Sequence, residues 1–189
     1  MARKSIRTVP YRRKREGKTN YKDRLNHLLS RKPRLVIRKS LKNITIQLVE
    51  YHPDGDFTKV KVNSKALQKF GWNFSTNNLP ACYLAGLLAG KTALSKNVDE
   101  AVADLGMQSK IHGSKVYAAL KGVVDSGFKI PYSEKCFPSE ERLKGGHIQN
   151  HFSNLKEKDV QYSSYMKNNL DPSNIQEAFE KTKKKILES

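Results

Sequence analysis

RLVIRKSLKNITIQLVEYHPDGDFTKVKV, residues 34–62, decides the fold, because three runs in it alternate between apolar and polar side chains. Such alternation is typical of β-strands with one buried face. The links between the runs are short, and the second, Pro53-Asp54-Gly55-Asp56, has the residues that a tight turn requires. The stretch therefore predicts a three-stranded antiparallel meander with at least one face buried.

Helical periodicity follows the meander. A short helix is expected over residues 64–71, and a second helix, apolar on nearly all sides and therefore buried, over about 80–96. Residues 98–105 are a possible fourth strand, although their composition also permits a helix. A third helix is expected over 114–127. We therefore predict an α/β fold, with a mixed sheet built from the meander and a helix–strand–helix unit, and with helices packed on it.

Two extensions flank this domain. Residues 1–18 have no hydrophobic periodicity and are expected to be disordered until bound; a helix follows and stops at Pro33. Beyond Pro131 the chain is expected to be irregular, with a short helix at 139–144, before Asp171-Pro172 opens a last helix with one apolar side. The predicted organisation is a basic N-terminal arm, an α/β domain and a helical C-terminal extension, over residues 1–18, 19–152 and 153–189.

Positive charge is concentrated at the N-terminus. The 189 residues carry a net charge of +18, and the first forty hold fifteen Lys and Arg against only Glu16 and Asp23. A dense block of like charge requires a polyanion to neutralise it. Arginine predominates in the arm, and Tyr11 and Tyr21 are interleaved with it, which favours phosphate contacts and base stacking over a solvated tail. The arm has no apolar helix face, which argues against a membrane surface.

Several features bear on the cellular compartment. No apolar run approaches the roughly twenty residues that span a bilayer, and the basic start, Met1-Ala2-Arg3-Lys4, has no apolar stretch behind it. Cys82 and Cys136 lack the spacing of a metal or redox motif and suit a reducing compartment. We expect a soluble cytoplasmic protein.

Other motifs give little support to catalysis or to a cofactor. Residues 85–92, AGLLAGKT, match a relaxed phosphate-loop pattern, but they lie within the apolar helix, where the backbone N–H groups are already used. Gly86 and Gly90 are instead expected to let this helix pack closely on the sheet. Three carboxylates are expected to be solvated: Asp99, Asp104 and Asp125.

The order of elements is also that of ribonuclease H, whose two-metal chemistry requires a carboxylate on the first strand. Residues 34–39 contain none, so a nuclease is disfavoured. His147 and His151 are four residues apart, but zinc ligands usually occur in tighter sets, and no metal site is predicted.

Five stretches together resemble one ribosomal family. They are YRRKREGKTNY at 11–21, RKPRLVIRKS at 31–40, PACYLAGLLAG at 80–90, GSKVYAALKG at 113–122 and PSEERL at 138–143. In this order they are similar to large-subunit ribosomal protein eighteen in its archaeal–eukaryotic branch, the 5S rRNA-binding family of the central protuberance. The resemblance runs from about residue 9 to residue 152. The longer C-terminal extension of the eukaryotic members is not found here, which favours an archaeal protein.

The resemblance implies a structural, non-catalytic protein of the cytoplasmic large subunit, without cofactor, membrane or small-molecule substrate. It implies binding to 5S rRNA, attachment of that RNA to 23S rRNA, and contact with neighbouring proteins of the central protuberance. The family's RNA-binding arm corresponds here to Arg3, Arg12, Arg13, Lys14, Arg15, Lys18 and Tyr21, continued by Arg31, Lys32, Arg34, Arg38 and Lys39. Their positive charge and their position make Lys115, Lys121 and Arg142 further candidate RNA contacts. The alternative is a non-ribosomal RNA chaperone or RNA-processing factor.

Overall fold

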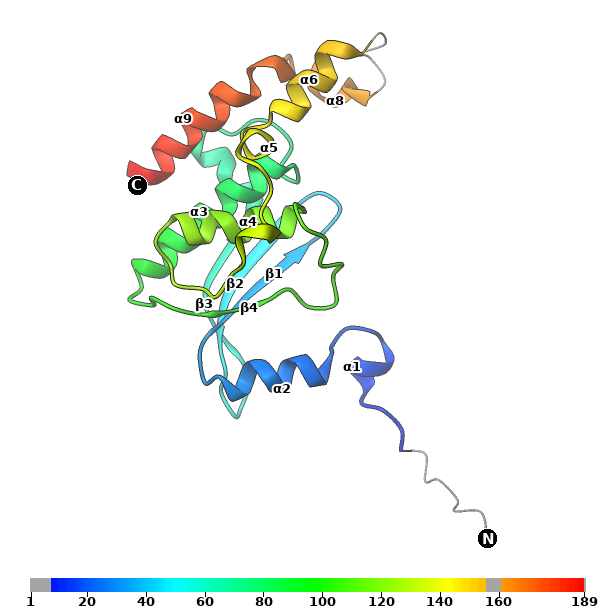
Figure 1. The fold of residues 1–189 in the computed structure, drawn as a ribbon, viewed down its shortest axis with the longest axis vertical. Helices are drawn as coiled ribbons and strands as arrows, with labels where there is room; N and C mark the ends of the chain where they lie inside the picture. The colour runs from blue at the N-terminus through cyan, green and yellow to red at the C-terminus, as the bar shows by residue number, and fades with distance from the viewer. Residues whose placement is uncertain (1–7, 156–160, 189) are drawn as a thin grey trace.

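A four-stranded mixed sheet forms the centre of the protein (Figure 1). The structure is a computed structural model that describes residues 8–155 and 161–188. Strands β1 (Arg34–Lys39), β2 (Ile44–Glu50) and β3 (Phe57–Asn63) form the predicted antiparallel meander. Strand β4 (Val102–Asp104) pairs in parallel with β1, which gives the order β3-β2-β1-β4. The predicted mixed sheet is confirmed, and the ambiguous stretch at 98–105 contains a strand.

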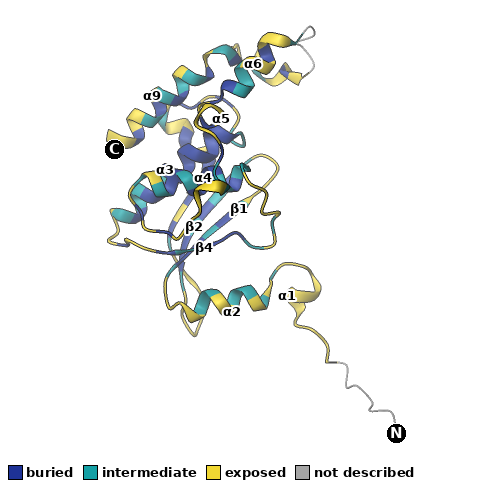
Figure 2. Ribbon diagram, in the orientation of Figure 1, coloured by how far each residue is buried: buried dark blue, intermediate teal, exposed yellow. Residues whose placement is uncertain are grey.

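One face of the sheet carries the hydrophobic core. Helices α3 (Leu79–Leu94) and α4 (Lys115–Asp125) cover this face, and the 3-10 helix η1 (Ser64–Phe70) follows β3. The buried residues gather between these helices and the strands (Figure 2). Alternate side chains of the meander are buried, as their pattern predicts: Leu35, Ile37, Ile44, Ile46, Leu48, Val60 and Val62.

Helices α3 and α4 run parallel and touch backbone to backbone. A Cβ atom added at Gly86 would overlap the carbonyl group of Ala119, and one added at Gly90 would overlap the side chain of Ser126. The contacts advance along both helices in the same direction, which fixes their parallel orientation. The glycines of the AGLLAGKT segment therefore join two helices, and our expectation that they join a helix to the sheet is wrong.

The C-terminal part of the chain adds helices beyond α3 (Figure 1). The 3-10 helix η2 (Glu134–Cys136) leads to them. They are α5 (Glu140–Lys144), α6 (Gly146–Asn154), α8 (Ser163–Lys167), the 3-10 helix η3 (Pro172–Asn174) and α9 (Ile175–Glu188). The predicted apolar side of α9 is confirmed, because Ile175, Phe179, Thr182 and Ile186 are buried. Helix α6 lies in a stretch that we expected to be irregular, and it crosses the predicted boundary between residues 152 and 153.

Lys91 ties α3 to the end of α9. Its Nζ donates to the carbonyl oxygens of Ile186 and Leu187, at 2.9 and 2.6 Å. The last carbonyl groups of a helix have no partner within the helix and carry the negative end of its dipole. The lysine of the AGLLAGKT segment thus caps a helix.

The basic arm lies at the opposite end of the molecule from the C-terminal helices (Figure 1). It contains α1 (Arg12–Arg15), a single turn, and leads into α2 (Tyr21–Leu29), whose cap is the Asn20 side chain. Neither helix contains a buried residue. The helix predicted before Pro33 is confirmed. The expectation that the arm lacks regular structure is wrong for α1, and residues 1–7 lie outside the described residues. Among the described helices, none is long and apolar enough to cross a membrane.

Gly86→Ala should destabilise the protein, although alanine is the better helix former. In an open helix the change would stabilise by about 1 kcal/mol. Here the methyl group meets the backbone of α4, and such overpacking costs roughly 1–3 kcal/mol. Urea unfolding followed by circular dichroism measures the difference, with Lys184→Ala on the exposed side of α9 as the control. A gain in stability for Gly86→Ala would contradict the contact.

Candidate nucleic-acid interface

Arg34 lies at the centre of an ion-pair network that joins α2, the helix that follows the arm, to the sheet. Its side chain is 5% exposed, and its guanidinium group donates to Oδ2 of Asp56 at 2.6 Å and to Oδ2 of Asp104 at 3.3 Å. Asp56 also accepts from both terminal nitrogens of Arg24 on α2, at 3.0 and 3.1 Å. Asp104 accepts from Nη2 of Arg38 at 2.9 Å. Three arginines and two carboxylates therefore fasten α2 to β1.

The network keeps both carboxylates ionised. Burial by itself would raise the pKa of Asp56, but hydrogen bonds and charges from Arg24 and Arg34 lower this pKa below its ordinary value. Burial opposes ionisation of Asp104 as well, and its pKa is lowered mainly by the hydrogen bond and charge of Arg38. A folded-state pKa below the unfolded one means that the stabilisation is present above the unfolded pKa. It is lost as the pH falls through the folded pKa.

These contacts change the roles of two predicted residues. Arg34 is buried and its charge is balanced by two carboxylates. We therefore assign it to the positioning of α2 and the arm, and we do not propose it as an RNA contact. Asp104 is buried and paired with two arginines, so the expectation that it is solvated is wrong. Arg38 differs from Arg34, because 42% of its side chain remains exposed beside Asp104.

The described part of the arm, residues 8–18, presents its cations to solvent. The exposed residues are Arg12, Arg13, Lys14, Arg15 and Lys18. Glu16 lies 2.8 Å from Nζ of Lys18, but a surface pair of this kind contributes little free energy. At the base of the arm the rings of Tyr11 and Tyr21 lie 5.1 Å apart at a tilt of 49°. The arm is therefore a cationic strip that begins beside an aromatic pair.

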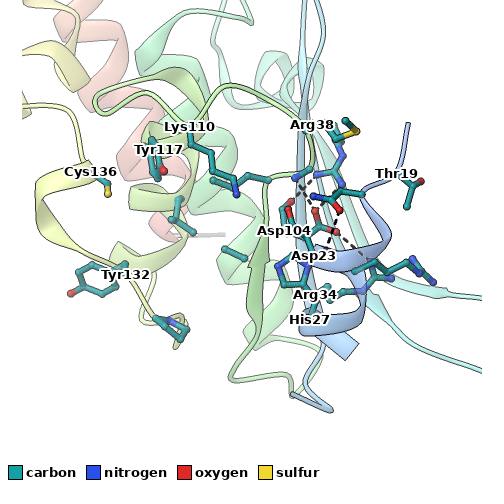
Figure 3. A pocket seen from close by; sticks show the side chains of 18 of the residues that line it. Thr19, Asp23, His27, Arg34, Arg38, Asp104, Lys110, Tyr117, Tyr132 and Cys136 are labelled. Atoms are coloured by element: carbon teal, nitrogen blue, oxygen red, sulfur yellow. Dashed lines mark hydrogen bonds and ion pairs between the residues drawn. The ribbon is translucent and has the colours of Figure 1, made fainter. Parts of the chain in front are cut away.

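A cleft of about 380 Å³ lies between the arm and the β4 edge of the sheet. Figure 3 shows Thr19, Asp23 and His27 on the arm side, with Tyr117, Tyr132 and Lys110 on the other. The Arg34–Asp104–Arg38 contacts lie between them, and the cleft is also lined by Arg13, Lys18, Arg24 and Phe137. Cations next to aromatic rings suit an unpaired base with its flanking phosphates.

Sequence reasoning missed the far wall of this cleft. Lys110 stands between two exposed apolar residues, Met107 and Ile111, and this combination in a loop was the available signal. Tyr132 and Phe137 lie in a stretch that we treated only as irregular, although it also contains exposed lysines. Their partner surface, the arm, is more than a hundred residues away in the chain, so no local pattern pairs them.

Three predicted cations lie away from the arm and close to one another. Lys39, Lys115 and Arg142 come from separate parts of the chain and line a second, open groove at the end of β1. This grouping is not visible in the sequence. The cleft beside the arm and this second groove therefore both contain predicted RNA-binding residues, but the cleft and the groove lie on different surfaces of the protein.

The remaining predicted residues are more scattered. Lys121 lies 3.0 Å from Asp125 and 5.3 Å from the centre of the Phe137 ring, at one side of the cleft. Lys32 pairs with Glu100 at 2.6 Å. Arg31 is exposed in a left-handed turn, and Arg3 lies outside the described residues.

The structure gives no support to the catalytic alternatives. The AGLLAGKT segment is inside α3, as its composition predicts, so its N–H groups serve the helix. The acids nearest β1, Asp56 and Asp104, are bonded to arginines. Burial raises the pKa of Cys82 to about 12, which keeps this thiol protonated. Within residues 8–155 and 161–188, no group of three or more His, Cys, Asp or Glu could hold a metal ion.

Comparison with known proteins identifies the family. Residues 7–103 match the model of a family described as ribosomal large subunit proteins 60S L5 and 50S L18. Large ribosomal subunit protein uL18 of Methanococcus maripaludis is 46% identical over 183 residues, which cover 95% of each chain. The chain belongs to this ribosomal family. The membership confirms the predicted resemblance, an archaeal-type structural protein of the cytoplasmic large ribosomal subunit that is not an enzyme.

As a member of this ribosomal family, the chain has rRNA and ribosomal proteins as its partners. The exposed cations of the arm and the two grooves are surfaces of the kind that rRNA phosphates require. The ion-pair network around Arg34 holds α2, and with it the first of these surfaces, the arm, against the sheet.

Asp104→Asn should destabilise the protein at neutral pH, because it removes the countercharge of Arg34 and Arg38 at constant side-chain size. Arg34 keeps its contact with Asp56 at 2.6 Å and Arg38 is 42% exposed, so the loss is smaller than for an unpaired buried charge, about 1–3 kcal/mol of unfolding free energy. The difference from the wild type should begin to shrink below about pH 4, where the unfolded chain takes up the proton, and should vanish only below the lowered folded-state pKa of Asp104. Urea unfolding at several pH values measures it. Asp99→Asn, at an exposed carboxylate, is the control, and equal losses in both variants at pH 7 would contradict the network's role.

Proposed function

We propose that this protein binds 5S rRNA and helps to attach it to 23S rRNA in the central protuberance, beside neighbouring large-subunit proteins. The observation that carries the proposal is the exposed arm, with five cations between residues 12 and 18, anchored to the sheet next to a cleft with aromatic walls. Membership of a large-subunit family supports an RNA partner, and the resemblance stated above supports 5S rRNA in particular.

The arm contributes affinity through phosphate contacts. Each arginine or lysine that neutralises a phosphate releases condensed counterions into solution. If six to ten phosphates are neutralised, the logarithm of the affinity falls with the logarithm of the salt concentration at a slope of roughly −5 to −9. The proposed contacts are Arg3, Arg12, Arg13, Lys14, Arg15, Lys18, Arg31, Lys32 and Arg38.

The cleft contributes selectivity for structured RNA. Tyr117, Tyr132 and Phe137 offer rings for an unpaired base, and Lys110 lies beside them. Tyr21 adds an aromatic surface at the base of the arm, where it already contacts Tyr11. A regular duplex hides its bases within the stack, so this arrangement favours a loop or a bulge over a continuous helix.

The Arg34 network gives the arm a fixed starting direction. Because Arg24 and Arg34 share Asp56, α2 cannot swing away from β1 without exposing unpaired charges. Pre-ordering of this kind lowers the entropy cost of binding. We propose a functional division into the arm (residues 1–18), the rRNA-binding domain (19–152) and the C-terminal extension (153–189); the second boundary falls within α6, so it is functional and not structural.

Replacing the four basic residues of α1 tests the arm. In Arg12→Gln/Arg13→Gln/Lys14→Gln/Arg15→Gln, the salt slope for 5S rRNA should become shallower by about 3, from 0.7–0.9 for each lost phosphate contact. Filter binding over a series of KCl concentrations measures the slope. The matched control, Lys65→Gln/Lys69→Gln/Lys181→Gln/Lys184→Gln, removes the same charge from exposed sites outside the arm and both grooves. Equal slopes in the two variants would refute the arm's role.

A competition experiment separates the proposal from its alternative. Unlabelled 5S rRNA should displace labelled 5S rRNA from the wild-type protein at much lower concentration than unrelated hairpins of similar length. An RNA chaperone would bind all of them with similar affinity, and an RNA-processing factor would cleave its target in the presence of magnesium. Either result would overturn the assignment to 5S rRNA.

A further inference from the structure

The second groove lies where the amino ends of α3, α4 and α6 meet the carboxyl end of β1. It is open, with a volume of about 1050 Å³, and is lined by Lys39, Lys115 and Arg142 together with small polar residues and a few apolar or aromatic ones, among them Leu41 and Tyr165. None of the described residues that line it is an aspartate or a glutamate. The lining side chains therefore carry a net positive charge, which the neighbouring Glu141, close enough to act on His147, balances only in part.

The helices add to this positive potential. Helix α3 has 16 residues and α4 has 11, and their glycine-mediated contact holds them parallel, with both amino ends at the groove. Each amino end carries about half a positive charge and backbone N–H groups without a partner in the helix. Two parallel dipoles at close range repel each other, and an anion at their shared positive end relieves this repulsion.

A third observation is the clustering of unpaired polar atoms. In the described part of the chain, five buried side-chain nitrogen or oxygen atoms make no hydrogen bond. Four of them belong to residues that line this groove: Asn77 Oδ1, Asn78 Nδ2, Ser114 Oγ and His147 Nδ1. A buried polar atom without a partner costs free energy. These atoms are covered in the free protein, so a polar ligand in the groove satisfies them once their half-buried side chains rotate toward it.

Two of these residues have capacity for a ligand. Ser114 stands at the cap position of α4, but its hydroxyl group makes no capping hydrogen bond to the helix. Burial and the charge of Arg142 lower the pKa of His147 below its ordinary value, against a smaller opposing effect of Glu141, so at neutral pH one ring nitrogen donates and the other accepts. Hydroxyl, amide and imidazole groups beside lysine and arginine match the oxygens of a phosphodiester and the 2′-hydroxyl group of ribose.

We propose that this groove is a second RNA site, which binds the phosphodiester backbone of ribosomal RNA independently of the arm. The proposal rests on the proposed function, and it adds a pre-formed site on the rigid domain. Strand β1 connects the two sites, because Arg34 lies in the arm network and Lys39 lines the groove. Five residues of strand span roughly 17 Å, so one folded RNA can reach both. Leu41, 96% exposed at the rim, offers an apolar contact to a ribose or a base.

Lys115→Gln/Arg142→Gln in the full-length protein tests the groove. Filter binding should give a salt slope shallower by about 1.4–1.8, as expected for two lost phosphate contacts, and an affinity about tenfold to hundredfold lower. Lys69→Gln/Lys184→Gln removes the same charge from exposed positions outside both grooves and should behave as the wild type. Lys115→Arg/Arg142→Lys keeps the charge and should retain the wild-type slope. Titrations with 5S rRNA alone and with 23S rRNA alone show which RNA supplies the phosphates.

Failure of this inference is distinct from failure of the proposed function. If the wild type does not prefer 5S rRNA to unrelated hairpins, the proposed function fails. If the wild type binds and the arm variant loses affinity, but the groove variant matches its control on both RNAs, the groove inference is overturned. Thermal melting monitors folding of each variant. Arg142 is exposed, so Arg142→Gln alone gives a second reading, with an expected slope change of about 0.7–0.9.

Discussion

The position of the arm depends on one buried arginine held between two carboxylates. Arg34 contacts Asp56 and Asp104, and these acids also hold Arg24 and Arg38. Helix α2 has no buried residue of its own, so this network supplies the attachment that a hydrophobic face would normally give. Removal of charges from water is costly, and the contacts offset that cost only as a complete set. A polar attachment of this kind suits a segment whose other side must face a highly charged partner.

The protein has two kinds of cationic surface, one on the arm side of the sheet and one at the carboxyl end of β1. On the arm side the charges stand on long, exposed side chains with few fixed contacts, which can follow an irregular backbone. At the carboxyl end of β1 the charges sit among helix ends and small polar groups whose positions are set by the packing of α3 against α4. One domain thus offers an adaptable surface, which can follow an irregular RNA backbone, and a rigid surface, which holds the RNA in one position.

The elements that were predicted correctly from the sequence are those with a local periodic pattern. The alternation at Leu35 and Ile37 and the apolar stripe that includes Phe179 each repeat within a few residues, so the strands and α9 could be recognised. Helix α6 could not, because it begins at a glycine and buries few apolar residues. Burial of Arg34 was equally hidden, since its partners lie 22 and 70 residues away and only the folded chain brings them together. The two grooves are assembled from distant segments for the same reason.

The last helix has a consequence for biosynthesis. Helix α3 is apolar on nearly every side, and part of its surface is covered by α9, where Phe179 lies 5.6 Å from the Tyr83 ring and Lys91 holds the helix end. A nascent chain therefore leaves the α9-facing side of this central helix uncovered until residues 175–188 have emerged from the exit tunnel. The cationic leader has been free to capture nucleic acid for most of that time. The order of synthesis thus exposes this protein to premature RNA binding and aggregation before its own interior is sealed, a hazard that an escort protein would relieve.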